Sequence, residues 1–423
     1  MSRFRTAGIE ISVVLPILVA TMLLGCGQQQ ESLPNGTGIW RASVDTLGHT
    51  VTVRTLEGSV WGSRARLVEE ASIGTAAGEE FYLFGDVRGI TASRDRIFVL
   101  DWQLSMVRVY DHEGRYLQDI GRQGSGPGEF RDPIAIDLDE ERDRLYVRDR
   151  VGGLVHVFTL AGEYVETLRA ALGGNISSLT KTIRLSENGT PYLLSLMFFP
   201  NPRTPDMISS RYVMLGMQGG DAPYDTLGVP WYDYRGLQIQ GSGLQPWVTV
   251  PFSPGKNWNM TRSRAMIGGV SDSYRFEIRH YDGRHTTIER EVAPIPVLPE
   301  ESRWYITALA DRMRLTDPDW MWRGPAMPDL KPAFEAFIPD RNERIWVIRK
   351  GPGVMSGDSG AWSDTWLLDV FEEESGRYLG GIEVPPGIRF QPEPCIFDDQ
   401  FIAYCQDEAG VPYVRRYRLR LPD

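Results

Sequence analysis

Two stretches of the chain repeat the same pattern of residues at a distance of 48 positions. The first runs from Asp95 to Leu117 and the second from Asp143 to Val165. Asp-Arg-Ile-Phe-Val-Leu-Asp in the first copy matches Asp-Arg-Leu-Tyr-Val-Arg-Asp in the second. Each copy contains short alternating runs of β-branched and aromatic residues that end in turn residues, which predicts strands. A repeat of this length, with about four short strands in each unit, is typical of the blades of a β-propeller.

Further segments with the strand pattern bring the predicted number of blades to six, with seven as the alternative. We expect the blades near residues 82–120, 130–170, 182–215, 247–284, 334–379 and 388–420. Both ends of the chain also carry alternating runs, Val51–Arg54 and Tyr413–Arg420. A closed propeller commonly completes its last blade with a strand from the other terminus. We therefore expect these two runs to meet in one blade.

One segment departs from the strand pattern. Between Pro299 and Leu315, apolar residues fall on one face of a helix, acidic residues occupy the first turn and Pro318 follows the end. These features predict an α-helix. We expect one helix near residues 300–315, inserted between two blades of an all-β fold.

The two repeat copies are joined by a glycine-rich connector, Ile120–Phe130, with the sequence Ile-Gly-Arg-Gln-Gly-Ser-Gly-Pro-Gly-Glu-Phe. A strand follows this connector, whereas a phosphate-binding glycine loop is followed by a helix. The connector and the strand after it resemble the NHL-repeat type of six-bladed β-propeller, and are most similar to its bacterial lipoprotein members. The clear resemblance covers residues 70–170. It implies a fold and leaves the activity open.

The N-terminus carries a predicted targeting signal. Arg3 and Arg5 precede a 14-residue apolar stretch, Ile11–Leu24, which is short for a membrane span and typical of a signal peptide. It ends in Leu23-Leu24-Gly25-Cys26, which resembles a bacterial lipobox. The resemblance implies cleavage after residue 25 and a lipid on the thiol of Cys26. An uncleaved anchor and an ordinary secretory signal are the alternatives.

This signal gives the predicted organisation of the chain. Residues 1–25 form a lipoprotein signal peptide, residues 26–39 a flexible tether, and residues 40–423 the six-bladed β-propeller. The predicted location is the bacterial cell envelope, with a lipid anchor in the membrane. Gly27 after the lipidated cysteine resembles the pattern that directs lipoproteins to the outer membrane.

The two remaining cysteines, Cys395 and Cys405, flank a predicted hairpin around Asp398-Asp399. A three-residue loop would place Cys395 opposite Ala403 and leave Cys405 on the diagonal. Diagonal neighbours lie roughly 7–8 Å apart, which strains a bridge. An envelope location favours oxidation. A disulfide and two buried thiols therefore both remain open.

Charge and motif content exclude several classes of function. The formal net charge of −11 argues against a nucleic-acid partner, which would need clustered Lys and Arg. The five histidines show no zinc-ligand spacing. Gly357–Gly360 resembles a protease nucleophile motif but has no suitable histidine partner. Calcium is the one cofactor left open, since Asp101 and Asp149 could face a central channel or could accept hydrogen bonds in turns.

Aromatic residues in loops are the candidate binding residues. Nine of the 12 tryptophans lie between positions 231 and 366. Exposed loop aromatics often mark recognition surfaces. The candidates that follow from this distribution are Trp231, Tyr232, Trp258, Trp320, Trp322 and Trp362.

Two hypotheses of function follow. The first is a lipid-anchored binding or scaffold module for a protein, peptide or glycan, with no catalytic residues and no nucleic-acid partner. The second is a calcium-dependent hydrolase or lyase of the six-bladed propeller superfamily, which would need carboxylates that converge from different blades.

Overall fold

The computed structural model describes residues 39–169, 176–201, 204–217, 225–242, 245–355 and 360–422. The signal peptide, most of the tether and Cys26 lie outside these residues and remain predictions, as does most of the Gly357–Gly360 motif. Within the described residues, no helix has both the length and the apolar character needed to cross a membrane.

The two repeat copies form two four-stranded antiparallel sheets, as expected. Blade 1 consists of β4 (Val87–Ala92), β5 (Arg96–Asp101), β6 (Met106–Asp111) and β7 (Tyr116–Ile120). Blade 2 consists of β8 (Pro133–Asp139), β9 (Arg144–Asp149), β10 (Leu154–Phe158) and β11 (Tyr164–Arg169). A short 3-10 helix, Glu80–Tyr82, precedes blade 1.

The middle of the chain builds two further blades. Blade 3 consists of β12 (Ile176–Leu185), β13 (Pro191–Asn201), β14 (Thr204–Gly216) and β15 (Thr226–Gly228). Blade 4 consists of β18 (Lys256–Met260), β19 (Met266–Val270), β20 (Arg275–Arg279) and β21 (His285–Arg290). The expected first strand of blade 4, around residues 247–250, belongs to a different hairpin that is described below.

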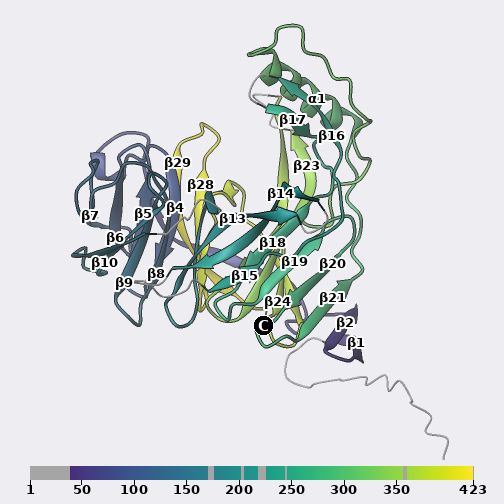
Figure 1. Ribbon diagram of the computed structural model, residues 1–423, viewed down its shortest axis with the longest axis horizontal. Coiled ribbons are helices and arrows are strands. Elements are labelled where there is room, and N and C mark those ends of the chain that lie inside the picture. The colour runs from purple at the N-terminus through teal and green to yellow at the C-terminus, as the bar shows by residue number, and fades with distance from the viewer. Residues whose placement is uncertain are drawn as a thin grey trace, which may run out of the picture.

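The C-terminal part of the chain forms the last two blades. Blade 5 consists of β22 (Ala336–Pro339), β23 (Arg344–Met355), β24 (Trp362–Glu372) and β25 (Tyr378–Glu383). Blade 6 contains β26 (Ile388–Arg389), β27 (Cys395–Phe397), β28 (Gln400–Gln406) and β29 (Pro412–Arg420). The chain is therefore a six-bladed β-propeller, in which the blades stand around a common centre (Figure 1).

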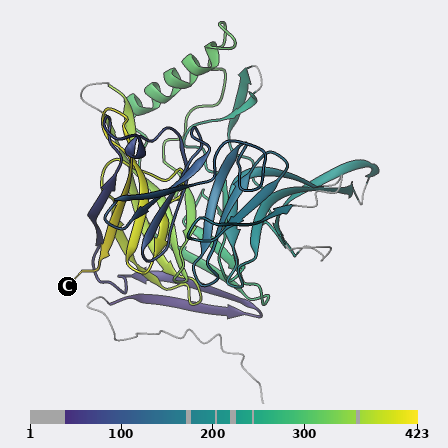
Figure 2. The ribbon, with the colours of Figure 1, turned by 90° about the vertical axis from the view of Figure 1, so that its left-hand side faces the viewer.

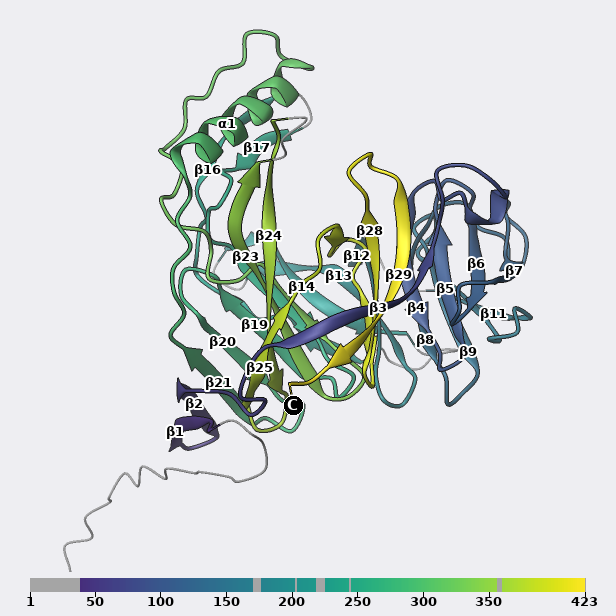
Figure 3. The same cartoon turned by 180° about the vertical axis from the view of Figure 1, so that it is seen from behind.

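A strand from the N-terminal part of the chain completes blade 6. This strand, β3 (Ala65–Ile73), pairs antiparallel with β29, from Val414 against Ile73 to Arg420 against Arg66. The two ends of the chain thus meet in one blade, but the N-terminal segment is β3 and not the expected Val51–Arg54. Figure 3 shows β3 crossing from β25 to β29. The pairing covers the outer edge of blade 6.

The segment around residues 51–54 is part of an N-terminal hairpin. Its strands are β1 (Arg41–Leu47) and β2 (Thr50–Glu57), and β2 pairs parallel with β21 of blade 4. Trp40, Ala42 and Val53 are buried against the core of that blade. The hairpin therefore extends blade 4 outward instead of closing the ring.

The predicted helix is present as α1 (Pro299–Arg314). It packs beside a separate two-stranded sheet of β16 (Gln238–Ser242) and β17 (Gln245–Thr249), and Ile239, Leu309 and Met313 are buried between them. We call α1, β16, β17 and the segment that follows α1, residues 315–323, the excursion. It stands at one end of the molecule, and the β1–β2 hairpin lies at the opposite end (Figure 2).

Central strands are apolar on both faces because each blade is packed between two others. Ile97, Phe98, Val99 and Leu100 of β5 are all fully buried. Their continuous apolar run follows from burial on both faces of the strand.

Aromatic side chains fill the space between neighbouring blades. Phe276 of blade 4 lies 5.1 Å from Phe337 and 5.4 Å from Phe371 of blade 5, measured between ring centroids. Burial of each such ring contributes roughly 1.5–3 kcal/mol to the free energy of folding.

A buried cluster of charged groups anchors the excursion to blade 5. The Nζ atom of Lys331 lies 2.7 Å from Oε1 of Glu301 in α1 and 2.5 Å from Oδ1 of Asp364 in β24. The side chains of Lys331 and Glu301 are wholly inaccessible to solvent. Lys350 approaches the second oxygen of Asp364 to 3.1 Å. Removing one member of such a cluster leaves a buried charge without its partner.

Of the two alternatives left open for the C-terminal cysteines, the structure has the two buried thiols. Both thiols are buried and free. The hairpin loop contains two residues instead of three, because Phe397 pairs with Gln400, and Cys395 consequently faces Ile402. Cys405 lies three residues beyond Ile402, so the two thiols project to opposite faces of the sheet. Cys395 packs toward blade 1, whereas Cys405 packs within the core shared with blade 5.

The closing strand gives a pH-dependent prediction. Glu70 of β3 lies 2.6 Å from Arg416 and 2.5 Å from Arg418 of β29. The hydrogen bond from Arg418, together with the charge of Arg416, lowers the pKa of the Glu70 carboxyl. A carboxyl whose pKa is lowered by folding stabilises the fold above its unfolded pKa and ceases to do so as the pH falls through its folded pKa.

We expect Glu70→Gln to lower the free energy of unfolding at pH 7 by roughly 1–2 kcal/mol, as measured by urea denaturation. The difference from the wild type should shrink below about pH 4. Glu69→Gln is the matched control, because Glu69 is more exposed and its ion pair with Arg415 spans 3.5 Å. A pH-independent difference would contradict this account.

The buried cluster gives a second prediction. Lys331→Met should lower the free energy of unfolding by roughly 3–5 kcal/mol, because Glu301 and Asp364 lose their shared cation while they stay buried. Glu300→Gln, at the exposed neighbouring position on α1, should change it by less than about 0.5 kcal/mol. A loss below about 1 kcal/mol in Lys331→Met would show that the cluster does not hold the excursion.

Candidate functional site

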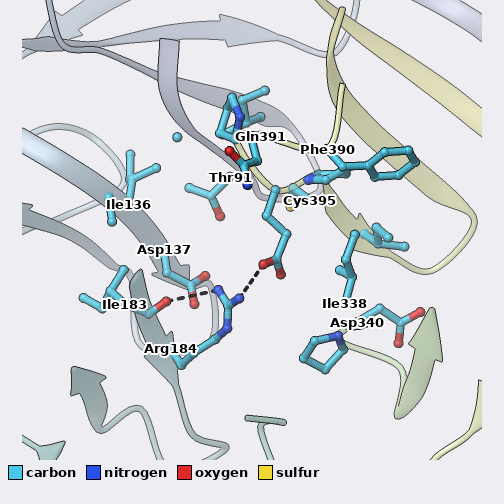
Figure 4. Close-up of a pocket in the computed structure, with 18 of the residues that line it drawn as sticks. Thr91, Ile136, Asp137, Ile183, Arg184, Ile338, Asp340, Phe390, Gln391 and Cys395 are labelled. Atoms are coloured by element: carbon cyan, nitrogen blue, oxygen red, sulfur yellow. Dashed lines mark hydrogen bonds and ion pairs between the residues drawn. The ribbon is translucent and has the colours of Figure 1, made fainter. Parts of the chain in front are cut away.

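The candidate site is a cavity of about 630 Å³ at the centre of the ring. Every blade contributes its innermost segment to the wall of this cavity, which we call the central channel (Figure 4). The contributing segments are 86–91, 135–137, 183–185, 260–262, 336–341 and 390–396. A cavity built in this way collects side chains that are far apart in sequence.

Arg184 of blade 3 connects three blades inside the channel. Its Nε donates to Oδ1 of Asn259 in blade 4 at 2.9 Å, and its Nη2 lies 2.5 Å from Oε2 of Glu393 in blade 6. Asn259 in turn donates to the carbonyl of Phe337 in blade 5 at 2.7 Å. Figure 4 shows Arg184 and its ion pair in the channel. Because its donors are directed at these partners, Arg184 mainly braces the ring.

Two further arginines flank Asp137 of blade 2. Arg341, which follows β22, donates to the carbonyl of Ala92 at 2.6 Å and to the hydroxyl of Thr91 at 2.9 Å. Arg262, which follows β18, donates to the carbonyl of Leu138 at 2.9 Å. Their guanidinium groups lie 3.9 and 3.8 Å from Oδ1 of Asp137. These separations exceed the roughly 2.7–2.9 Å of a charge-assisted hydrogen bond.

Four arginines and four carboxylates line the channel, so their formal charges balance. Arg184, Arg262 and Arg341 face two carboxylates, Asp137 and Glu393. Arg88 pairs with Asp86, and Asp340 pairs with Arg344, which does not line the channel. Positive charge exceeds negative charge only locally, at Asp137, where two guanidinium groups share one carboxylate. In a partly enclosed site, such an arrangement favours an anion.

Asp101 and Asp149, the two carboxylates considered for calcium, accept backbone hydrogen bonds in turns. The carboxylate of Asp101 accepts from the amides of Gly85, Asp86 and Leu104. The carboxylate of Asp149 accepts from the amides of Arg131, Asp132 and Val151. These equivalent residues tie the strand end to the preceding connector in each blade. In the part of the chain that the structure describes, no three His, Cys, Asp or Glu side chains are grouped as metal ligands.

Three of the predicted aromatic residues lie together on blade 4. Trp258 of β18 pairs with Gly268 of β19. The hydroxyl of Tyr232 lies close to the same glycine and donates a hydrogen bond to Glu277 at 2.7 Å. Burial raises the pKa of the Tyr232 hydroxyl. Trp231 remains 70% exposed, with the ammonium of Lys256 4.3 Å from the centre of its ring. Trp231 is therefore the member of this group that presents most of its surface to solvent.

The other three aromatic candidates lie on or beside the excursion. Trp320 is buried in its small core and donates to the carbonyl of Gln240 at 3.0 Å, so its ring cannot face a ligand. Trp322 packs partly against the same core. Trp362 begins β24, pairs with Met355 and is half-buried. The six residues thus form two separate groups instead of one platform, and none of them lines the channel.

The channel arginines were not identified from the sequence. A charged residue between apolar neighbours on an inner strand, as in Ile136-Asp137-Leu138 or Ile183-Arg184-Leu185, was the available signal. That signal shows which residues are unusual within a strand. It does not show that residues from blades 2, 3 and 6 meet at one point.

Comparisons with known proteins agree with the architecture. A family model described as a 6-bladed beta-propeller matches residues 78–181, which span blades 1 and 2 and enter blade 3. The sequence matches no curated protein significantly.

Solved structures with similar folds come from several proteins. A member of the DUF4221 family from Bacteroides vulgatus has 10% sequence identity and a TM-score of 0.51, over 85% of this chain and 99% of that one. A protein of unknown function from Bacteroides thetaiotaomicron has 11% identity and a TM-score of 0.41, over 92% and 83% of the two chains. Virginiamycin B lyase from Staphylococcus aureus has 9% identity and a TM-score of 0.37, over 78% and 94%. The first similarity supports the fold, and these identities transfer no activity.

Proposed function

We propose that this protein is a lipid-anchored binding module of the bacterial cell envelope, and that its central channel binds a peptide or glycan through a carboxylate. The observation that carries the proposal is the pair of guanidinium groups at Asp137. Arg262 and Arg341 lie at 3.8 and 3.9 Å from one carboxylate oxygen, so neither makes a tight ion pair with it. An incoming carboxylate could make closer contacts with them.

The chemistry of arginine favours this ligand class. A guanidinium group presents several N–H donors in one plane and matches the two oxygens of a carboxylate. Arg262 is the better candidate for direct contact, because one of its nitrogens is engaged at Leu138 and its side chain is 27% exposed. Arg341 is 17% exposed and directs two nitrogens at blade 1. We assign Arg262 to the ligand and Arg341 mainly to the position of Asp137.

The size of the channel fits a small organic ligand, and part of its wall is apolar. Ligand sites are commonly about 300–1,000 Å³, with apolar walls and a few polar groups that set the orientation. The cavity of about 630 Å³ falls in this range. Its apolar lining includes Ile90, Ile136, Ile183, Phe337 and Phe390. An acidic peptide end or a uronic-acid residue could place its carboxylate at Arg262 and its apolar surface along this wall.

The N-terminal signal supports the envelope location. The lipobox pattern at Cys26 and the short tether precede the hairpin of β1 and β2. This hairpin and the excursion lie at opposite ends of the molecule (Figure 2). A tether at residue 39 would hold the hairpin end near the membrane and direct the excursion away from it.

A second candidate, scaffolding of another protein, is favoured by exposed apolar side chains at the excursion end. Trp247, Leu315, Met321 and Met355 are 64%, 84%, 55% and 61% exposed. Large exposed apolar side chains that gather in one region can mark contacts with other proteins. The calcium-dependent enzyme has no comparable observation in its favour, since the carboxylates of Asp101 and Asp149 are engaged by backbone amides.

The lipid anchor predicts a specific labelling result. In the native bacterium, the wild-type chain should incorporate radiolabelled palmitate and sediment with membranes. Cys26→Ala should incorporate no label, because the thiol that carries the diacylglycerol is absent. Cys405→Ala is the control and should label like the wild type. Equal labelling of the wild type and Cys26→Ala would contradict the anchor.

The channel ligand predicts a difference between charged and neutral probes. Calorimetric titration should show binding of oligogalacturonate or of peptides with a free C-terminal carboxylate, and weaker binding of the matched methyl esters or amides. Arg262→Gln should weaken binding of the acid by about tenfold or more, the loss expected for one charge-assisted hydrogen bond. Arg94→Gln removes an exposed charge on blade 1 and should leave the affinity unchanged. Equal binding of acids and neutral probes, or no binding of either acid, would overturn the proposal.

A further inference from the structure

A second polar cavity, of about 290 Å³, lies away from the channel. Blade 4, blade 5 and the loop between β2 and β3 form its walls, and we call it the arginine pocket. Its polar and small lining residues are Gly58, Ser59, Gly62, Ser63, Arg64, Arg290, Arg349, Asp369, Tyr378 and Gly381. None of these residues lines the central channel.

Three arginines and a single carboxylate line the arginine pocket. Arg290 lies 2.9 Å and Arg349 lies 3.4 Å from different oxygens of Asp369. Arg64 lines the same pocket and forms no ion pair with any of the described residues. With three arginines and one carboxylate, the lining of the pocket has an excess of two positive charges. Arg290 and Arg349 are largely buried, with 23% and 11% of their side chains exposed, so solvent screens their charges only partly.

Two tyrosines also hold Asp369 in place. The hydroxyl of Tyr274 donates to its Oδ2 at 2.9 Å, and the hydroxyl of Tyr378 donates to its Oδ1 at 2.8 Å. The carboxylate of Asp369 thus accepts hydrogen bonds from two tyrosines and forms ion pairs that orient two arginines. The guanidinium of Arg290 also lies 3.8 Å from the centre of the Tyr378 ring. These contacts fix the arginines before any ligand arrives, which lowers the entropy that binding would cost.

The loop from residue 58 to residue 64 brings backbone and hydroxyl groups to the same place. Gly58 has a φ of 68°, and a side chain there would collide with the carbonyl of Ile39. Glycine therefore allows the loop to turn directly beside the entry of the N-terminal chain. The loop is fastened to blade 5, because the amides of Val60 and Trp61 donate to the carbonyls of Tyr378 and Leu379. Ser59 and Ser63 then line the pocket with hydroxyl donors.

We propose that the arginine pocket binds a phosphate group. A phosphate carries one or two negative charges and several acceptor oxygens, which match an excess of two positive charges and a mixed set of guanidinium and hydroxyl donors. A further cavity of about 290 Å³ shares Gly58 and Arg290 with the pocket, and Glu57 and Glu291 also line it. An uncharged remainder of a phosphate ester, such as a glycerol group, would fit this cavity better than a second anionic group.

The position of the arginine pocket points to one source of phosphate. It lies beside Ile39, where the predicted lipid tether enters the described part of the protein. The lipid anchor would place the pocket near the headgroups of membrane phospholipids. The assignment of a phospholipid as the source of the phosphate therefore rests on the proposed membrane anchor. Phosphate recognition itself rests on the pocket alone. A free phosphate ester is the other source with the same chemistry.

Calorimetry on the full chain can test the site and its source together. Inorganic phosphate and glycerophosphoglycerol, the headgroup of phosphatidylglycerol without its acyl chains, are titrated separately. We expect the wild type to bind both probes, and the diester to bind at least as tightly as phosphate if the ligand is a lipid headgroup. Tighter binding of inorganic phosphate alone would overturn the lipid source, and the absence of heat with both would overturn the pocket.

Variants of the loop provide the residue-level test. Arg64→Gln should weaken binding of both probes by about tenfold, and Ser63→Ala by about threefold, with the melting temperature unchanged because both side chains are exposed. Arg94→Gln, on blade 1, should bind like the wild type. Unaltered binding by Arg64→Gln would refute the assignment. Arg64→Gln should also leave oligogalacturonate binding unchanged, which separates a failure of this site from a failure of the channel.

Discussion

The structure depends on the pairing of β3 with β29. A propeller blade that lacks its outer strand exposes a row of unpaired backbone groups, and a ring with an open blade can separate at that point. Here the closing strand comes from the N-terminal side, and Glu70 holds it to Arg416 and Arg418. Because β3 also meets β25 of blade 5, one strand joins two neighbouring blades and covers an edge. The central channel can form only when the ring is closed, because all six blades line it.

Closure brings the innermost strands of six blades around one cavity, and this geometry explains its arginines. Polar groups in such a position need partners, since water reaches them only partly. Arg184 and Arg341 find those partners on other blades and so brace the ring from within. Arg262 and Asp137 form the less tightly paired part of the same network. A binding module of this kind would recognise its ligand with residues that also hold its blades together.

The two additions to the ring are attached by different physical means. The β1–β2 hairpin joins blade 4 through a parallel strand pairing and buried apolar side chains. The excursion has its own small apolar core and is anchored by the buried ion pairs of Lys331 with Glu301 and Asp364. The two additions lie at opposite ends of the molecule (Figure 1). The arginine pocket is at the hairpin end, while the most exposed apolar side chains gather around the excursion.

The sequence by itself determined the repeated blades and the inserted helix, because these depend on local periodicity and on a repeat that is visible in one dimension. It left two roles open for Asp101 and Asp149, and only the structure selects the role in turns. It could not assign the closing strand, since Val51–Arg54 and Ala65–Ile73 both carry strand patterns and only packing selects β3. It placed Cys395 one residue out of register, because a two-residue loop replaced the expected three. The channel and the arginine pocket were decided by tertiary structure alone. Arg184, Arg262 and Arg341 come from different blades, and Arg64 meets Arg290 and Arg349 only when the ring is closed, so no local pattern records either site.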